Sequence, residues 1–203
     1  MIQIINNWFF NLVDAYMHYK YGRRKVPLFK GHPTVIIEIG GGYGANFRYL
    51  KKGTKVKVIE PNNGFFDVLR YRANRYEINL EIYETGGEEM PFPENSHEMV
   101  MSSLVLCSVQ NPAQVLSEIK RVLKPEGKFV YLEHVKADEH SWICKVQELT
   151  KTPWKWFFDG CHVNRNTGKA IKDADFSTVQ QNQFSHKTIF IPIIPHIEGI
   201  ATK

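Results

Sequence analysis

The stretch "VIIEIGGGYGANF", from Val35 to Phe47, decides the fold of this chain. It opens with a short run that is rich in β-branched residues and interrupted by Glu38, which is typical of a buried strand. Four glycines follow between Gly40 and Gly44, and the next residues, "ANFRYLKK", predict a helix. Glycine lets a ligand approach the backbone closely, and the start of a helix directs free N–H groups at it. The stretch therefore predicts a strand, a turn and a helix that together cradle a small ligand.

Two classes of ligand fit this turn equally well. Gly40, Gly42 and Ala45 match G-x-G-x-x-A, the pattern of dinucleotide-binding dehydrogenases. Glu38, Gly40, Gly42 and Gly44 also match E-x-G-x-G-x-G, the pattern of class I methyltransferases that bind S-adenosylmethionine. The turn alone does not decide between them.

The composition is that of one ordinary globular domain. The chain has 203 residues, of which 43% are hydrophobic and 23% are charged. The net charge of +5 is dispersed except in "KYGRRK" at residues 20–25, so we expect no nucleic-acid partner. The three cysteines are widely spaced, which favours a reducing, intracellular compartment. Cysteine and histidine show no zinc-site spacing, so the sequence predicts no metal site.

The N-terminal residues 1–30 form a predicted amphipathic helix and basic linker, followed by one catalytic domain over residues 31–203. Polar residues interrupt the helix too often for a membrane span. One interpretation is a lid on the domain core. The other is a peripheral membrane anchor that places Trp8 and Phe9 in lipid and the basic cluster 20–25 on head groups.

Strands and helices alternate along the first two-thirds of the chain, which predicts a parallel α/β sheet. Amphipathic helices are predicted at residues 64–76 and 112–124, and an irregular aromatic cover at residues 137–172. The predicted strands are residues 34–39, 55–60, 79–84, 98–106 and 128–135, and a closing hairpin uses residues 176–184 and 196–203.

The carboxyl ends of these strands carry the candidate site residues, because ligands of such sheets bind there. Glu60 lies 20 residues after Gly40, where a carboxylate can bind a ribose diol in either ligand class. A short-chain dehydrogenase would also need a tyrosine four residues before a lysine, placed after the fourth strand. The pairs Tyr16/Lys20 and Tyr21/Lys25 have this spacing but precede the glycine turn, which disfavours the dehydrogenase.

Several further segments carry a resemblance to a known family. "IIEIGGGYGANF", "VIEPN", "GEEMPFPENSHEMVMSSLVLCSV", "EIKRVLKPEGKFVYLEHV" and "FFDGC" resemble the methyltransferase-like 7 family, thiol S-methyltransferases of the class I superfamily. The resemblance extends from about Trp8 to the C-terminus. It implies a doubly wound, Rossmann-like, mostly parallel sheet of seven strands with a C-terminal antiparallel hairpin. It also implies S-adenosylmethionine as cofactor and a small, lipophilic thiol as methyl acceptor.

The resemblance further implies a set of cofactor contacts. Glu38 and the glycines would hold the methionine end, Glu60 the ribose, the turn after the third strand the adenine, and residues 103–107 the region below the sulfonium. The complete predicted set is Glu38, Gly40, Gly42, Gly44, Asn46, Glu60, Pro61, Asn62, Gly87, Glu88, Glu89, Ser103, Leu104, Val105 and Cys107.

The catalytic candidates are His134, at the end of the fifth strand, and Asp159 in the aromatic cover. His134 can promote a thiolate or simply pack at the site, and Asp159, with Cys161 and His162, can line the acceptor pocket or form a polar turn. Two alternatives to the thiol methyltransferase stay open: an O- or N-methyltransferase of a small molecule, and a catalytically silent protein at a membrane or lipid-droplet surface. We expect a monomer that is cytoplasmic or peripherally associated with the endoplasmic reticulum or lipid droplets.

Overall fold

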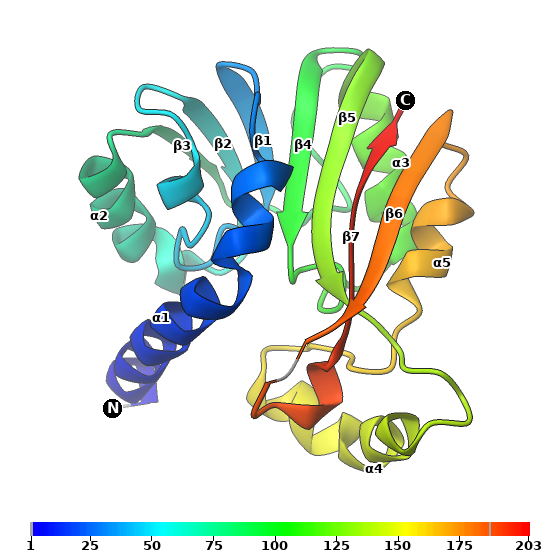
Figure 1. Cartoon of the computed structure of the whole chain (residues 1–203). Helices are drawn as coiled ribbons and strands as arrows, with labels where there is room; N and C mark the ends of the chain where they lie inside the picture. Colours follow the sequence, from blue (N-terminus) through cyan, green and yellow to red (C-terminus); the bar gives the residue numbers. More distant parts are fainter. Residues whose placement is uncertain (1, 187) are drawn as a thin grey trace.

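The computed structural model describes the backbone of residues 2–186 and 188–203, and side chains from residue 15 onward. The predicted lipid contacts of Trp8 and Phe9 lie outside the described side chains. Figure 1 shows one twisted sheet with helices on both faces and at one end.

Seven strands form the sheet in the order β3-β2-β1-β4-β5-β7-β6. All neighbouring pairs are parallel except β5–β7 and β7–β6, so β7 alone of the seven runs against the others. This arrangement confirms the predicted fold class, including the C-terminal antiparallel hairpin. The strands are β1 (Val35–Ile39), β2 (Lys55–Ile59), β3 (Asn79–Tyr83), β4 (His97–Ser103), β5 (Leu123–His134), β6 (Thr178–Ser185) and β7 (Pro195–Thr202).

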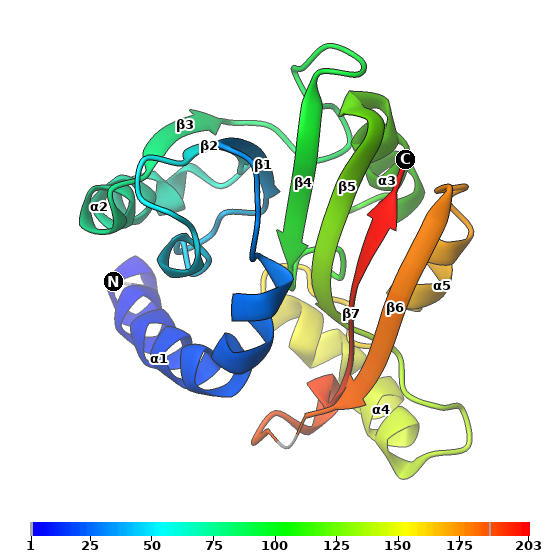
Figure 2. The same cartoon turned by 45° about the horizontal axis from the view of Figure 1, so that its top comes forward.

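Alternating side chains of the strands build two cores, one on each face of the sheet. On β1, Ile36 belongs to one core, whereas Ile37 and Ile39 belong to the other. Helix α2 (Phe66–Tyr76) covers the first face with Leu69, and α3 (Pro112–Val122) covers the second with a stripe that includes Ile119. Figure 2 separates α2 and α3 across the sheet. The sheet is therefore doubly wound, and the order in which strands are added reverses between β1 and β4.

Two predictions about local structure are wrong. The glycine turn leads into a short 3₁₀ turn, η1 (Phe47–Tyr49), instead of a regular helix. Positive φ angles at Gly40, Gly42 and Gly44 coil the chain before it, which leaves few residues for a helix. The supposedly irregular segment 137–172 contains two helices, α4 (Trp142–Phe157) and α5 (Thr167–Lys172).

The described part of α1 (Ile2–Leu28) packs against the sheet end and the closing hairpin. Tyr21 Oη lies 2.6 Å from Nε2 of the buried His196, and Arg24 forms a 2.7 Å ion pair with Glu198 on β7. Lys25 donates to Asn46 over 2.8 Å. These contacts favour the lid interpretation for residues 15–28. Among the described residues, no helix combines the length and hydrophobicity that a membrane crossing needs.

Two further 3₁₀ turns complete the fold, η2 (Asn63–Phe65) before α2 and η3 (Ile191–Ile193) before β7. β7 begins at Pro195 and lies inside the hairpin, between β5 and the edge strand β6. A proline is tolerated there because it is the first residue of the strand.

The apolar stripe of α3 allows a prediction of how far a cavity in the larger core lowers the free energy of unfolding. Ile119 is fully buried there, so Ile119→Ala should lower the free energy of unfolding by about 2–5 kcal/mol in urea denaturation. The matched control is Ser117→Ala at an exposed position of the same helix, which should change the value by less than about 0.5 kcal/mol. An equal effect of the two substitutions would contradict the assignment of α3 to the core.

Candidate functional site

The candidate site lies where the carboxyl ends of β1, β2, β4 and β5 meet, at the end of the sheet that α1 and α4 flank in Figure 1. The glycine turn forms one side of it. A Cβ at Gly40 would stand 2.5 Å from both methyl groups of Val105, so only glycine permits this contact between the loops after β1 and β4. No such neighbour lies within 4 Å at Gly42, among the described residues, and its φ is +47°. The turn is therefore tightly packed at Gly40 and open at Gly42.

Glu38, on β1, is almost fully buried. Its Oε1 accepts a 2.7 Å hydrogen bond from Asn46, whose own oxygen accepts from Lys25. Its Oε2 is buried and has no hydrogen-bond partner in the described part of the chain. Burial raises the pKa of Glu38 to about 7, against the lowering effect of Asn46 and Lys25. The side-chain nitrogen and oxygen of Asn46 are thus both hydrogen-bonded within the protein. Asn46, which was predicted as a cofactor contact, therefore positions Glu38.

Glu60, directly after β2, joins the turn to the next strand. Its two carboxylate oxygens accept backbone N–H bonds from Gly42 at 2.8 Å and Asn62 at 3.0 Å. Burial raises its pKa, although the two N–H bonds oppose this. A carboxylate oxygen accepts more than one hydrogen bond, so Glu60 can hold the turn and still accept from a ligand hydroxyl. Pro61 and Asn62 are exposed beside it.

The loop after β4, residues 103–107, is fixed by a residue that was not among the predicted contacts. Glu133, at the end of β5 and fully buried, accepts from Ser102 Oγ at 2.6 Å and from the backbone N–H groups of Val105 and Leu106. These bonds hold Leu104 at a φ of +61°, an uncommon angle for a non-glycine residue. Ser103 Oγ, in the same loop, is buried without a hydrogen-bond partner among the residues described.

The predicted adenine-side residues have structural roles of their own. Glu88 Oε1 accepts from the backbone N–H groups of Gln110 and Asn111, at the start of α3. Gly87 is buried, with Ile39 packed where a Cβ would stand. Glu89 is exposed. The turn after β3 and the N-terminus of α3 therefore meet on this side of the site, and the adenine contacts of this turn stay a prediction.

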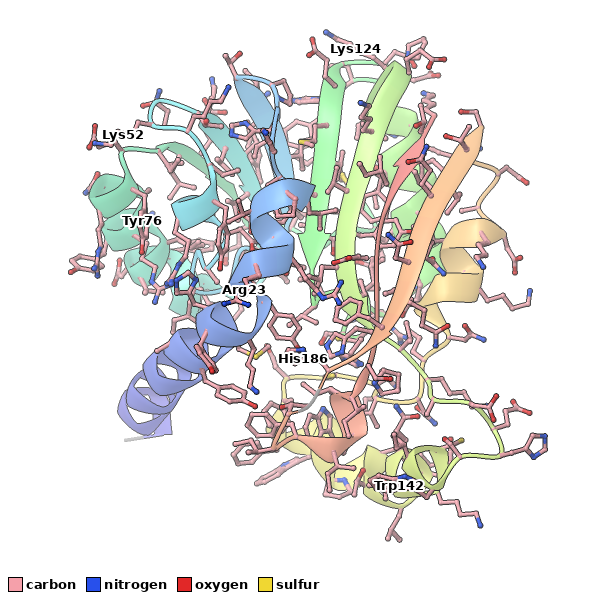
Figure 3. All side chains as sticks on the ribbon, viewed as in Figure 1. Arg23, Lys52, Tyr76, Lys124, Trp142 and His186 are labelled. Carbon is pink, nitrogen blue, oxygen red and sulfur yellow. The ribbon has the colours of Figure 1, made fainter. Side chains whose placement is uncertain are left out.

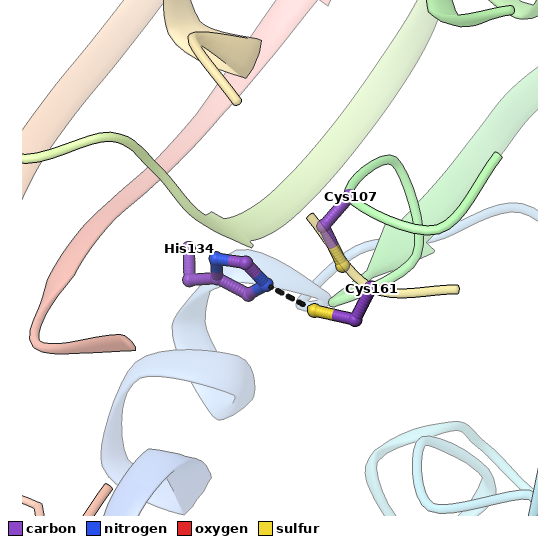
Figure 4. A group of neighbouring side chains, drawn as sticks. All are labelled: Cys107, His134 and Cys161. Carbon is purple, nitrogen blue, oxygen red and sulfur yellow. Dashed lines mark hydrogen bonds between the residues drawn. The ribbon is translucent and has the colours of Figure 1, made fainter. Parts of the chain in front are cut away.

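Three side chains that are far apart in the sequence meet at the other side of the site. The ligand atoms of Cys107, His134 and Cys161 all lie within 4.8 Å of one another, and each residue is buried. Figure 4 shows His134 pointing at Cys161, with Nε2 and Sγ 3.1 Å apart. Trp154 Nε1 donates to the same sulfur over 3.3 Å. We call these three residues the Cys–His–Cys cluster. Their sequence spacing gave no sign of it.

Electrostatic interactions within the cluster distinguish the two cysteines. Donation from the Cys107 thiol lowers the pKa of Cys161, although burial opposes this. The same hydrogen bond, together with burial, raises the pKa of Cys107. Cys161 is thus the more easily ionised sulfur. The other catalytic candidate, Asp159, is exposed with a φ of +46° in the turn after α4, and its charge contributes to the raised pKa of Glu60. The structure does not place Asp159 in the cluster.

These residues fit S-adenosylmethionine. The unpartnered, buried Oε2 of Glu38 is suited to an ammonium group, and Glu60 to the ribose diol. The open position at Gly42 leaves room for a ligand along the turn. Ser103 Oγ offers a further unpartnered polar atom on the neighbouring strand.

The raised pKa of Glu38 predicts how stability varies with pH in the absence of any ligand. The folded protein keeps the proton up to about pH 7, whereas the unfolded chain releases it near pH 4.5. The stabilisation that this group contributes is therefore fully present below pH 4.5 and is lost as the pH rises through 7. The loss lowers the free energy of unfolding by up to about 3 kcal/mol. Lys25, Asn46 and Glu60 face the carboxyl group and are included in this shift.

Urea denaturation of the wild type and Glu38→Gln at several pH values measures this effect. The variant cannot ionise, so its stability relative to wild type should increase between pH 4.5 and pH 8. Glu94→Gln, at an exposed position, is the matched control and should show no such trend. Parallel pH profiles for wild type and Glu38→Gln would refute the prediction.

Comparison with known proteins identifies the family. A family model described as a methyltransferase domain matches residues 37–131. Thiol S-methyltransferase TMT1B of Rattus norvegicus is 38% identical over 176 residues, which cover 84% of this chain and 71% of the relative. Thiol S-methyltransferase TMT1A of Homo sapiens is 34% identical over 171 residues, covering 83% and 70%.

Solved structures agree on the fold. A crystal structure of an S-adenosylmethionine-dependent methyltransferase from Thermotoga maritima, titled a possible histamine N-methyltransferase, superimposes with a TM-score of 0.68 at 18% identity. The alignment covers 100% of this chain and 96% of that one. The fold, the cofactor cradle and the sequence relatives agree, and this chain therefore belongs to the family of the thiol S-methyltransferases TMT1A and TMT1B, class I methyltransferases that depend on S-adenosylmethionine.

Proposed function

We propose that this methyltransferase transfers its methyl group to the sulfur of a small, lipophilic thiol. The similar curated proteins are thiol S-methyltransferases. The structural observation that supports this acceptor is an aromatic wall beside the Cys–His–Cys cluster. Trp154, bonded to Cys161, stacks on Phe158 at a centroid distance of 4.2 Å, and Phe190 meets both rings edge-on at 6.0 Å. Binding sites for lipophilic molecules combine such apolar walls with few polar groups.

The cofactor, when bound, supplies a methyl group that is already activated by a sulfonium. The protein then contributes mainly proximity and orientation. Glu38 and Glu60 would hold the donor at the carboxyl ends of β1 and β2, and the loop fixed by Glu133 would border the bound donor. The acceptor must react as a thiolate, because a free thiol with a pKa near 8.5 is mostly protonated at neutral pH. We expect the group that promotes this ionisation to lie at the end of β5, beside His134.

Methylation assays with a labelled methyl donor test the acceptor class. An alkyl thiol should be methylated, whereas the alcohol and amine of the same chain length should not.

Glu60→Ala should weaken binding of S-adenosylhomocysteine, measured by calorimetry, more than tenfold, because the carboxylate and its hydrogen bond to Gly42 are lost. Glu98→Ala, at the opposite end of β4, is the matched control and should bind normally.

Other outcomes of the methylation assay and the binding measurement would each contradict a different part of the proposal. Methylation of the alcohol or amine alone would assign an O- or N-methyltransferase. Micromolar binding of S-adenosylhomocysteine with no turnover of any acceptor would support the catalytically silent protein. Unchanged affinity of Glu60→Ala would remove Glu60 from the cofactor site.

We propose in addition that the protein works inside the cell at the surface of a membrane, as a monomer. All three cysteines are free, which suits a reducing compartment. Trp142, Leu149 and Trp156 recur every seven residues on α4 and are 60%, 82% and 86% exposed. Figure 3 shows Trp142 at the end of the molecule opposite Lys124. An exposed apolar stripe with tryptophan at both ends is typical of a helix that lies in a lipid interface, and it would place the aromatic wall close to a lipophilic substrate.

Vesicle flotation tests the membrane contact. The double variant Trp142→Ser/Trp156→Ser should lose most binding to liposomes, because the two largest apolar groups of the stripe are removed. Tyr71→Ser is the matched control, since Tyr71 is 63% exposed on α2, away from α4. Equal flotation of both variants and the wild type would contradict a role for α4.

A further inference from the structure

We propose that the Cys–His–Cys cluster binds a zinc-class cation with an open fourth position, which receives the sulfur of the methyl acceptor. The role of the fourth position rests on the proposed function, whereas metal binding by the three residues does not. Two cysteines and one histidine with an open position form a known type of catalytic zinc site.

The geometry of the cluster suits a tetrahedral cation. Zinc binds sulfur at about 2.3 Å and nitrogen at about 2.0–2.1 Å, so its ligand atoms lie roughly 3.5–3.8 Å apart. In the structure, His134 Nε2 and Cys161 Sγ are 3.1 Å apart, and all three ligand atoms lie within 4.8 Å of one another. Shifts smaller than about 1 Å therefore complete the triangle. Two thiolates and a neutral imidazole balance the charge of a divalent cation, which matters in a buried site.

The backbone around the cluster is held on both sides. His162 N–H donates to the carbonyl of Cys107 over 2.9 Å, which joins the loop after β4 to the segment after α4. Arg165 adds bonds to the carbonyls of Leu106 and Val109 at 2.7 and 2.8 Å. Trp154 donates to Cys161 Sγ, as groups around metal-bound sulfur commonly do. The backbone segments that carry the two cysteines are therefore joined to each other by bonds that leave the sulfur atoms available.

A fourth ligand from the protein is lacking in the described residues. The group contains no further Cys, His, Asp or Glu. Two neighbouring groups are engaged elsewhere: Glu133 accepts bonds from Ser102 and the loop after β4, and His196 is hydrogen-bonded to Tyr21. In this proposal the methyl acceptor supplies the fourth ligand. The acceptor R–SH would bind as R–S⁻, its proton passing to solvent, since a coordinated thiol is deprotonated. Methyl transfer would then give R–S–CH₃, a weakly coordinating thioether, and S-adenosylhomocysteine.

Metal binding is tested on the whole chain without donor or acceptor. Protein reduced with a phosphine and freed of metal by chelation should bind one equivalent of Zn²⁺ in calorimetry. Co²⁺ in its place should give a tetrahedral spectrum with a thiolate charge-transfer band. Cys107→Ser and Cys161→Ser should each weaken Zn²⁺ binding at least 100-fold, and the matched control Cys144→Ser, a buried cysteine outside the cluster, should bind like wild type. Circular dichroism spectra and urea midpoints close to those of the wild type verify that every variant is folded.

The open position is tested on the Co²⁺ protein with an alkyl thiol and the alcohol of equal length. The thiol should intensify the charge-transfer band, and the alcohol should leave it unchanged. Failure of wild type to bind Zn²⁺ or Co²⁺, or equal binding by the cysteine variants, would overturn the metal site. A Co²⁺ spectrum that ignores the thiol would overturn the fourth position. Neither result depends on turnover, so failure of the proposed function would be seen separately as absent thiol methylation by an intact, metal-loaded protein.

Discussion

The buried carboxylate of Glu133 holds the two halves of the site together. It lies at the end of β5 and satisfies Ser102 on β4 and two backbone N–H groups of the following loop. A buried charge is costly unless it is hydrogen-bonded. The carboxylate therefore needs these donors, and the donors in turn need the carboxylate as an acceptor. These bonds fix the segment that runs from Ser103, at the end of β4, to Cys107 of the Cys–His–Cys cluster, with His134 next to Glu133 in the chain.

The sheet topology explains why such a loop becomes a site. The order of the strands reverses between the parallel neighbours β1 and β4, so the connections after these strands lead to opposite faces of the sheet and a ligand can bind at the carboxyl ends. Gly40 brings the two loops into contact at Val105. Glu38 and Ser103, each with an unpartnered buried oxygen in the described structure, then lie on neighbouring strands. The cofactor cradle thus follows from strand order and a single close glycine contact.

The sequence predicted the sheet well and allowed candidate cofactor contacts to be placed at strand ends, because both are encoded locally. Alternating apolar residues mark the strands, and Glu38, Gly40, Gly42 and Glu60 lie at strand ends where parallel topology brings them together. Helix α4 escaped prediction because its large apolar residues face outward and Pro153 interrupts the pattern.

Interactions between distant segments were not predictable in the same way. Lys25 belongs to a basic cluster that looked solvent-exposed, yet it is 6% exposed and bonded to Asn46. The Cys–His–Cys cluster joins residues 27 and more positions apart through tertiary packing, and no local pattern reports such packing.

Helix α1 touches both ends of this arrangement. Through Lys25 and Asn46 it reaches Glu38, and through Tyr21 it reaches His196, whose ring lies 6.4 Å from that of His134. A displacement of the helix therefore disturbs the donor side and the acceptor side together. If donor binding holds α1 in place and thereby raises affinity for the acceptor, thermodynamic linkage requires that acceptor binding raises affinity for the donor by the same factor. The coupling between donor binding and acceptor binding then lies in the contacts of this helix.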